Sequence, residues 1–213
     1  MSPARLSSIV LILLNVAVLG GCGRDDGAAA NSTKVHYTVL DTRDQPLHAD
    51  FNRDKGNVRL MFLVDPRCPG CLRGLADMGD DLLSKLAKDA MVKVYVIYEP
   101  VIGGGATDIP AAAALLKSVM PRYYWNPTGD FGRQMSHVLD YWNGDRWVYA
   151  WDTWLIYPPD AVWKNGAPPK PAFLMHQLGG LPHNTRFPRL DGTVFADKVK
   201  SMLAATNQRT AGP

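Results

Sequence analysis

The sequence predicts an α/β domain with a central mixed β-sheet flanked by α-helices. The first observation is a nearly unbroken apolar run at Val58–Val64, typical of a strand buried on both faces. The second is a helical pattern of apolar residues three and four positions apart between Leu72 and Leu86. The third is another strand pattern at Val92–Tyr98. Strand, helix and strand in close succession predict a βαβ unit with two parallel strands.

The composition is that of a folded domain. The chain of 213 residues is 46% hydrophobic and 20% charged, which is enough apolar material for one domain with a hydrophobic core. The formal net charge is only +3. Since no run of lysine and arginine is dense enough to follow a phosphate backbone, we expect no nucleic-acid partner.

The start of the chain has the pattern of an export signal. Arg5 precedes an apolar stretch of about eleven residues, Ile9–Leu19, which suits a signal peptide but is short of the roughly twenty residues of a membrane span. The following Leu19-Gly20-Gly21-Cys22 resembles the bacterial lipoprotein signal, in which the cysteine receives lipid and the chain is cut before it. An ordinary secretory signal and an uncleaved anchor are the alternatives.

This pattern predicts how the chain is divided. Residues 1–21 are expected to be the lipoprotein signal peptide, and the polar residues 22–34 a flexible tether. The folded domain is expected at 35–205 and a disordered tail at 206–213. The protein would then be anchored by lipid at Cys22 to the periplasmic side of a bacterial membrane.

The strands outside the βαβ unit follow from local patterns. Val35–Leu40 is expected to be a first strand, and Trp154–Tyr157 a late one that ends at Pro158-Pro159. Asp160–Trp163 is expected to be the hairpin partner of the late strand, with Asn165-Gly166 as the turn.

The other helices are predicted from caps and spacing. Ile109–Met120 has a proline in its first turn, and a further helix is expected to start at Asp130 as its N-cap. Val194–Ala205 has an apolar helical face. Asp44-Gln45-Pro46 is expected to be a turn.

The three cysteines divide into a single residue and a pair. A secreted fold held by disulfides carries an even set of four or more, whereas Cys22 stands far from Cys68 and Cys71. With Cys22 acylated, both remaining thiols belong to one motif, Cys68-Pro69-Gly70-Cys71.

The position of this motif predicts its chemistry. It lies at the start of a helix, where free N–H groups and the positive end of the helix dipole stabilise a thiolate on Cys68. Pro69 suits the first helical turn because it has no N–H to lose. Arg67 adds a positive charge directly before the motif.

Strand, Cys-X-X-Cys motif and helix in this order resemble the thioredoxin superfamily. The matching segments are Val58–Val64, Cys68–Cys71, Leu72–Leu86, Val92–Tyr98 and Trp154–Trp163. The resemblance implies a thioredoxin-like fold, with an aromatic-rich insertion before the late hairpin. It also implies that Cys68 attacks a disulfide of a partner protein and that Cys71 resolves the mixed disulfide. The expected function is an extracytoplasmic, membrane-tethered thiol–disulfide oxidoreductase acting on protein thiols and disulfides.

Two residues depart from the superfamily pattern. A cis-proline usually precedes the strand that faces the motif, but Asp152 occupies that position here. The tryptophan usual beside the motif is replaced by Arg67. Arg67, Pro69 and Asp152 are therefore the residues expected to support the cysteine pair.

The missing proline opens a second hypothesis, in which the thiols bind Cu(I) in a metal-delivery protein. His137 or His176 would complete such a site with Cys68 and Cys71. Further candidates in the sequence are His183, Met175 and, more weakly, His36 and His48.

Two structural hypotheses remain for the cysteine pair. A structural zinc site would need a second cysteine pair or a His-x-x-x-His motif, and the sequence has neither. A purely structural disulfide would close too small a loop to stabilise the fold much.

Aromatic residues concentrate in one region. All six tryptophans lie between Trp125 and Trp163, within the aromatic-rich residues 123–163. They predict a core layer with an insertion packed on the sheet, or else a surface for a partner. The second interpretation makes the chain a non-catalytic thioredoxin-like binding module.

Overall fold

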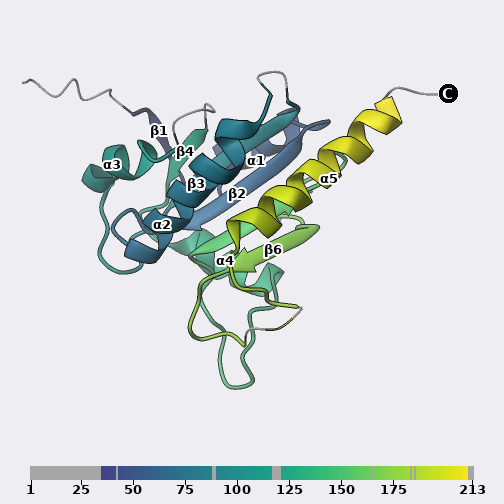
Figure 1. Cartoon of the computed structure of the whole chain (residues 1–213). Coiled ribbons are helices and arrows are strands. Elements are labelled where there is room, and N and C mark those ends of the chain that lie inside the picture. The colour runs from purple at the N-terminus through teal and green to yellow at the C-terminus, as the bar shows by residue number, and fades with distance from the viewer. Residues whose placement is uncertain are drawn as a thin grey trace, which may run out of the picture. The chain divides into compact units, whose positions relative to one another are not determined.

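The computed structural model describes residues 35–210, except for residues 42, 88–89, 117–120, 165, 183 and 185 (Figure 1). The predicted signal peptide and tether, and with them Cys22, lie outside the described residues.

The described residues contain a six-stranded mixed sheet in the order β1-β4-β3-β2-β5-β6. The strands are β1 (Tyr37–Val39), β2 (Val58–Val64), β3 (Val92–Tyr98), β4 (Arg122–Trp125), β5 (Thr153–Tyr157) and β6 (Phe173–His176). The first four strands run parallel to their neighbours, whereas β5 is antiparallel to β2 and β6 is antiparallel to β5. The predicted fold class is confirmed, and the βαβ strands have the predicted bounds.

Helices cover both faces of this sheet (Figure 1). One face packs against α2 (Pro69–Asp77), α3 (Ile109–Ala113) and α5 (Gly192–Thr210). The other face packs against α1 (Gln45–Arg53) and α4 (Asp130–Val138). The alternating side chains of β2 supply both cores, since Phe62 points to the first and Leu63 to the second. This is the layered architecture that the resemblance to the thioredoxin superfamily implies.

The helix α1 corrects the turn predicted at Asp44-Gln45-Pro46. The helix begins at Gln45, directly after Asp44 in a left-handed conformation (φ 50°). Pro46 lies in the first turn, where a missing N–H costs no intrahelical hydrogen bond. Leu47 and Phe51, one turn apart, are buried against the sheet and fix the helix there.

The predicted hairpin partner of β5 is also wrong. The partner is β6, whose Met175 pairs with Trp154. Trp163 is bound to α1 instead, because Asn52 donates from its side chain to the Trp163 carbonyl (2.8 Å) and accepts from the Trp163 N–H (2.8 Å). Contacts between distant segments therefore override the local Asn-Gly signal.

The helix that follows the cysteine pair is not regular over its predicted length. It is α-helical at Pro69–Asp77, π-helical at Met78–Leu82 (η1) and 3₁₀-helical at Leu83–Lys85 (η2). Gly79 lies in the π-helical turn, where any Cβ would overlap the carbonyl of Leu115. The backbone at Leu115 therefore lies against the helix at the point where its turn is widened to the π-helical form.

Other helix bounds differ from the predictions. A 3₁₀ turn at Ala106–Asp108 (η3) leads into α3, which ends at Ala113 rather than Met120 because the chain turns at the two following residues. The N-cap of α4 is Gly129 (φ 66°), and the predicted cap Asp130 is the first helical residue. A disordered tail was predicted at 206–213, but α5 extends to Thr210. Within it, the hydroxyl of Thr206 donates to the Met202 carbonyl one turn earlier (2.8 Å).

The aromatic-rich region serves mainly as core. Trp154, Tyr141 and Tyr157 are fully buried. Trp142 and Trp147 are 45% and 43% exposed and stack edge to face on each other. A single region thus contributes to the core and also presents two tryptophans to solvent.

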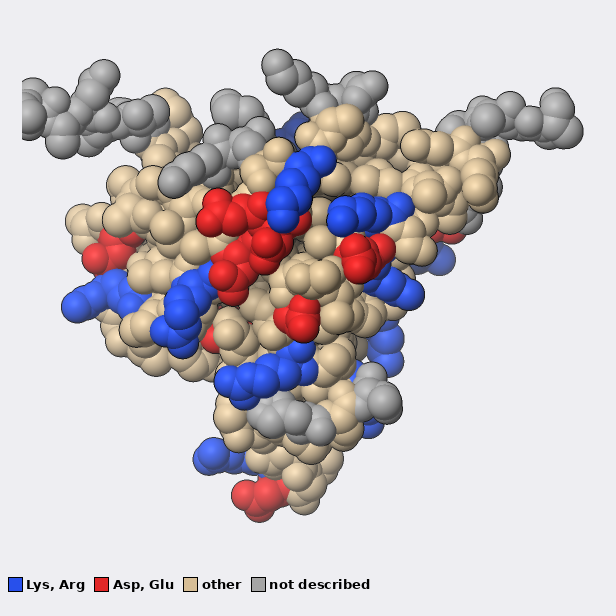
Figure 2. Space-filling view, in the orientation of Figure 1, with Lys and Arg blue, Asp and Glu red and all other residues tan. Residues whose placement is uncertain are grey.

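Surface charges are mixed in sign. Figure 2 shows lysine, arginine, aspartate and glutamate side chains interspersed on one face of the molecule. Several pair locally, such as Lys85 with Asp81 and Lys200 with Asp197. This agrees with the small net charge, and such exposed pairs contribute little to stability.

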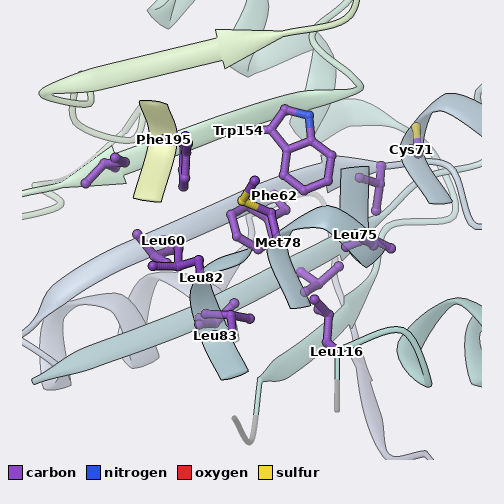
Figure 3. Close-up of a cluster of buried hydrophobic side chains, with 14 of the residues drawn as sticks. Leu60, Phe62, Cys71, Leu75, Met78, Leu82, Leu83, Leu116, Trp154 and Phe195 are labelled. Carbon is purple, nitrogen blue, oxygen red and sulfur yellow. The ribbon is translucent and has the colours of Figure 1, made fainter. Parts of the chain in front are cut away.

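The contact between α2 and β5 leads to a first prediction. Trp154 lies in the core beside Phe62 and Leu75 (Figure 3), and its ring meets α2 at Gly74, where a Cβ would overlap it. Gly74→Ala should lower the free energy of unfolding by about 2 kcal/mol, because the buried ring must move. Chemical denaturation measures this. Gly180→Ala, whose Cβ would lie 3.5 Å from Val148, is the control and should change stability by less than about 0.5 kcal/mol. Equal effects of the two changes would contradict the packing argument.

Candidate active site

Cys68 caps the N-terminus of α2. Its backbone is extended (φ −68°, ψ 119°), and its carbonyl accepts the N–H of Leu72 (2.9 Å), the first bond of the helix. Its Sγ accepts the N–H of Cys71 at 3.3 Å. Pro69 occupies the first helical turn, as predicted. The N–H of Cys71 therefore stabilises negative charge on the Cys68 sulfur.

The two cysteines differ in exposure. Cys68 retains 6% of its surface and Cys71 none, and both are free thiols. Burial raises the pKa of the Cys71 thiol well above its ordinary value, and the nearby Asp152 and the hydrogen bond with Cys68 raise it further. Both residues are buried, but Cys68 is the less enclosed of the two and is the better placed to meet a partner. The raised pKa favours the protonated thiol at Cys71.

Asp65 holds the loop that carries the motif. Its carboxylate is fully buried and accepts three backbone N–H groups, from Arg67 (2.8 Å), Ile102 (2.8 Å) and Gly104 (3.2 Å). Its carbonyl accepts the N–H of Cys68 (3.1 Å). Sequence reasoning missed this residue, although an acid directly after a buried strand was a signal.

Arg67 is exposed, and its guanidinium Nη1 donates to the Gly103 carbonyl at 3.4 Å. The side chain therefore lies along the loop that follows β3. Its predicted support of the cysteine pair through its positive charge stays a prediction.

Asp152 lies beside the cysteine pair, at the start of β5, with a left-handed backbone (φ 45°). Its Oδ1 accepts from Nε2 of Gln177 (2.9 Å) and from the indole N–H of Trp154 (3.3 Å). Gln177 also donates to the Gly70 carbonyl within the motif (3.1 Å). Burial raises the pKa of the Asp152 carboxyl, and these hydrogen bonds oppose the increase.

Three possible ligand atoms converge at this point. The sulfurs of Cys68 and Cys71 and a carboxylate oxygen of Asp152 all lie within 4.8 Å of one another, and all three residues are buried. The superfamily pattern predicted that Asp152 faces the motif. Gln177 and Trp154, which hold its carboxylate, were not predicted because Gln177 comes close only in the folded sheet.

Neither predicted histidine belongs to this group. His176 is fully buried, and its Nδ1 accepts the N–H of Leu178 (3.0 Å), so its Nε2 carries the proton and donates to the Phe187 carbonyl (3.1 Å). His137 is exposed and packs on the Trp147 ring. The predicted site of the two cysteines with one of these histidines therefore stays a prediction.

The other candidate ligands are accounted for in part. His48 contacts the Trp163 carbonyl (2.8 Å), His36 is exposed, and Met175 is buried in β6. His183 lies outside the described residues.

Within the part of the chain that the structure describes, no helix has the length and apolar character needed to cross a membrane.

No protein-family profile matches the chain, and no curated protein matches its sequence. Solved structures match its backbone. One is the solution structure of a candidate protein disulfide isomerase from Bacteroides thetaiotaomicron, with 12% identity, a TM-score of 0.47 and coverage of 75% of this chain and 82% of that chain. Another is a secreted disulfide oxidoreductase from Mycobacterium tuberculosis, homologous to E. coli DsbE, with 9% identity, a TM-score of 0.42 and coverage of 70% and 84%.

Proposed function

We propose that this chain, which has a thioredoxin-like fold with a Cys-X-X-Cys pair at the start of α2, is a thiol–disulfide oxidoreductase. The observation that carries the proposal is the asymmetry of the pair. Cys68 caps the helix and keeps some exposure, whereas Cys71 is fully buried behind it and donates its N–H to the Cys68 sulfur.

This asymmetry assigns the two steps. The Cys68 thiolate attacks one sulfur of a partner's disulfide, forming a mixed disulfide and releasing the other partner sulfur as a thiolate. The Cys71 thiol then gives up its proton, which ends on one of the two released partner thiolates, and attacks the Cys68 sulfur to release the second partner sulfur. Two electrons pass to the partner, and the protein is left with a Cys68–Cys71 disulfide. The same steps in reverse oxidise a partner dithiol.

The surrounding residues position the pair for both steps. Asp65 fixes the loop before Cys68 through four backbone groups, and Gln177 ties the Gly70 carbonyl to β5. A geometry held in this way keeps Cys71 within reach of the mixed disulfide, as an efficient intramolecular step requires.

The test uses two single variants in the Cys22→Ser background, which leaves only the thiols of the motif. Cys71→Ser should accumulate a stable mixed disulfide with a disulfide-bonded test protein, detected by mass spectrometry through Cys68. Cys68→Ser should form none and should lose at least 100-fold in exchange rate, since the buried thiol cannot replace it. Equal trapping by both variants, or unchanged exchange without Cys68, would refute the assignment.

We further propose that the protein works outside the cytoplasm, tethered by lipid on Cys22. This rests on the apolar segment Ile9–Leu19 and the Leu19–Cys22 pattern. Metabolic labelling with palmitate should be lost in Cys22→Ser and retained in Cys68→Ser. Equal labelling of wild type and Cys22→Ser would contradict the tether.

A further inference from the structure

We infer that the reduced sulfurs of Cys68 and Cys71, together with the carboxylate of Asp152, form a binding site for one zinc ion. This goes beyond the proposed redox function. The juxtaposition that carries it is the group of three buried ligand atoms within 4.8 Å of one another. The zinc hypothesis raised from the sequence lacked further ligands, because Asp152 lies far from the cysteine pair along the chain.

The spacing of these atoms is close to that of a zinc site. Zinc binds thiolate sulfur at about 2.3 Å and carboxylate oxygen at about 2.1 Å, so its ligand atoms in a tetrahedron lie roughly 3.7 Å apart. Ligands that are already within 4.8 Å reach that spacing by small side-chain rotations. Three protein ligands leave the fourth position for water or an incoming thiol.

The Asp152 carboxylate is oriented for this role. Its Oδ1 is held by the Gln177 amide and the Trp154 indole. Its Oδ2 faces the motif, since a Cβ built on Gly70 would lie 2.9 Å from Oδ2 and 3.6 Å from the Cys68 sulfur. One oxygen fixed by donors and the other turned to the metal is the usual arrangement of a carboxylate ligand.

Gly70 keeps the space between the ligands open. The two distances from its hypothetical Cβ show that a side chain there would enter the gap between Oδ2 and the Cys68 sulfur. The Gly70 carbonyl is meanwhile bonded to Gln177, which ties the motif to the residue that orients Asp152. An alanine at this position would keep all three ligand residues, but its Cβ would push the Asp152 Oδ2 out of its present place and fill the gap.

The chemistry of the ligands favours zinc over Cu(I). Two thiolates bind both ions well. A carboxylate oxygen is a hard ligand, which zinc commonly binds, whereas Cu(I) prefers sulfur ligands. Two thiolates and a carboxylate carry three negative charges, of which a divalent ion cancels two. Arg73 and Arg189 also act electrostatically on Asp152, and they offset the remaining charge.

Zinc binding and disulfide formation exclude each other at this site. Binding replaces the two thiol protons by the ion, whereas oxidation removes two electrons from the same sulfurs and leaves no thiolate to bind metal. The ion would therefore hold the pair in its reduced form until a chelator or an oxidant removes it.

The experiment titrates the full chain in the Cys22→Ser background, anaerobically reduced, with Zn²⁺ against a chromogenic chelator. One ion should bind per chain, and none after oxidation of the pair. Asp152→Asn, which keeps an oxygen for Trp154 and Gln177, and Gly70→Ala should each weaken zinc binding at least tenfold. Asp160→Asn, an exposed aspartate beyond the other end of β5, is the matched control and should bind like the parent.

A parallel titration with Cu(I) separates loss of the ligand from damage to the thiols. Cu(I) affinity should change less than threefold in Asp152→Asn, because the two sulfurs are intact. The inference is overturned if zinc does not bind at one ion per chain, if Asp152→Asn binds it as tightly as the parent, or if Cu(I) affinity falls as much as zinc affinity.

Discussion

Asp65→Ala is expected to lower the free energy of unfolding by about 4 kcal/mol and to slow thiol–disulfide exchange at least tenfold. The change removes one buried carboxylate that accepts three backbone N–H groups, from Arg67, Ile102 and Gly104. Each N–H then loses a charge-assisted hydrogen bond, worth about 1–3 kcal/mol when the donor is left without a partner. Exchange slows because the loop before Cys68 is no longer held to the loop after β3.

Denaturant unfolding and a stopped-flow exchange assay measure the two effects. Asp65→Asn should lie between wild type and alanine, since its amide retains one acceptor oxygen. Asp77→Ala removes an exposed aspartate at the end of α2 and should change stability by less than about 0.5 kcal/mol. The stabilising role assigned to the Asp65 carboxylate would be contradicted if Asp65→Ala and Asp77→Ala had equal free energies of unfolding.

Glu99→Gln is expected to stabilise the protein at pH 8–9 and to leave its stability unchanged near pH 4. Glu99 follows β3 and is fully buried, with Oε1 accepting the Gly132 N–H (2.9 Å). Burial raises its pKa from 4.5 to about 8, with smaller effects of Tyr149, Asp44 and Arg133.

The direction of the pH effect follows because the pKa of Glu99 is higher in the folded protein than in the unfolded chain. Between about 4.5 and 8 the unfolded chain ionises Glu99 while the folded protein keeps its proton. The folded protein thus binds more protons, so its stability falls as pH rises through this window and levels off above it. Glutamine has no proton to lose, and the difference from wild type should grow with pH to a few kcal/mol, as several pKa units imply.

Thermal or denaturant unfolding at half-unit steps from pH 4 to pH 9 tests this. Asp197→Asn changes an exposed acid on α5, and its stability curve should run parallel to that of wild type. Since Asp44, with a pKa raised to about 6, titrates in both proteins, only the difference between the curves reports Glu99. Parallel curves for wild type and Glu99→Gln would contradict a protonated, buried Glu99.

Sequence patterns predicted the elements that depend on neighbouring residues. The bounds of β2 and β3 came from apolar runs, and the start of α2 from a proline and a cysteine pair. The pattern Gln45-Pro46 suits both a turn and the first turn of a helix, because proline is favoured in each. This local pattern therefore does not by itself distinguish α1 from a turn.

Elements that depend on distant contacts were not predictable. The placement of β6 beside β5 is decided by sheet pairing between Trp154 and Met175, and Trp163 is removed from the sheet by Asn52 of α1. In the site, the cysteines were found from their motif. Asp65 and Gln177 were missed because their roles consist of bonds to backbone groups far away in the chain.

The π-helical turn at Met78–Leu82 has a consequence for how this helical segment packs. It inserts an extra residue into one turn, so the two halves of this helical segment are out of phase. The orientation of the first half is set by the cysteine pair and by Gly74 against Trp154, and that of the second by Leu82 and Leu83 in the core. Leu82 and Leu83 therefore meet the core in a different register from the one that an unbroken α-helix would give them.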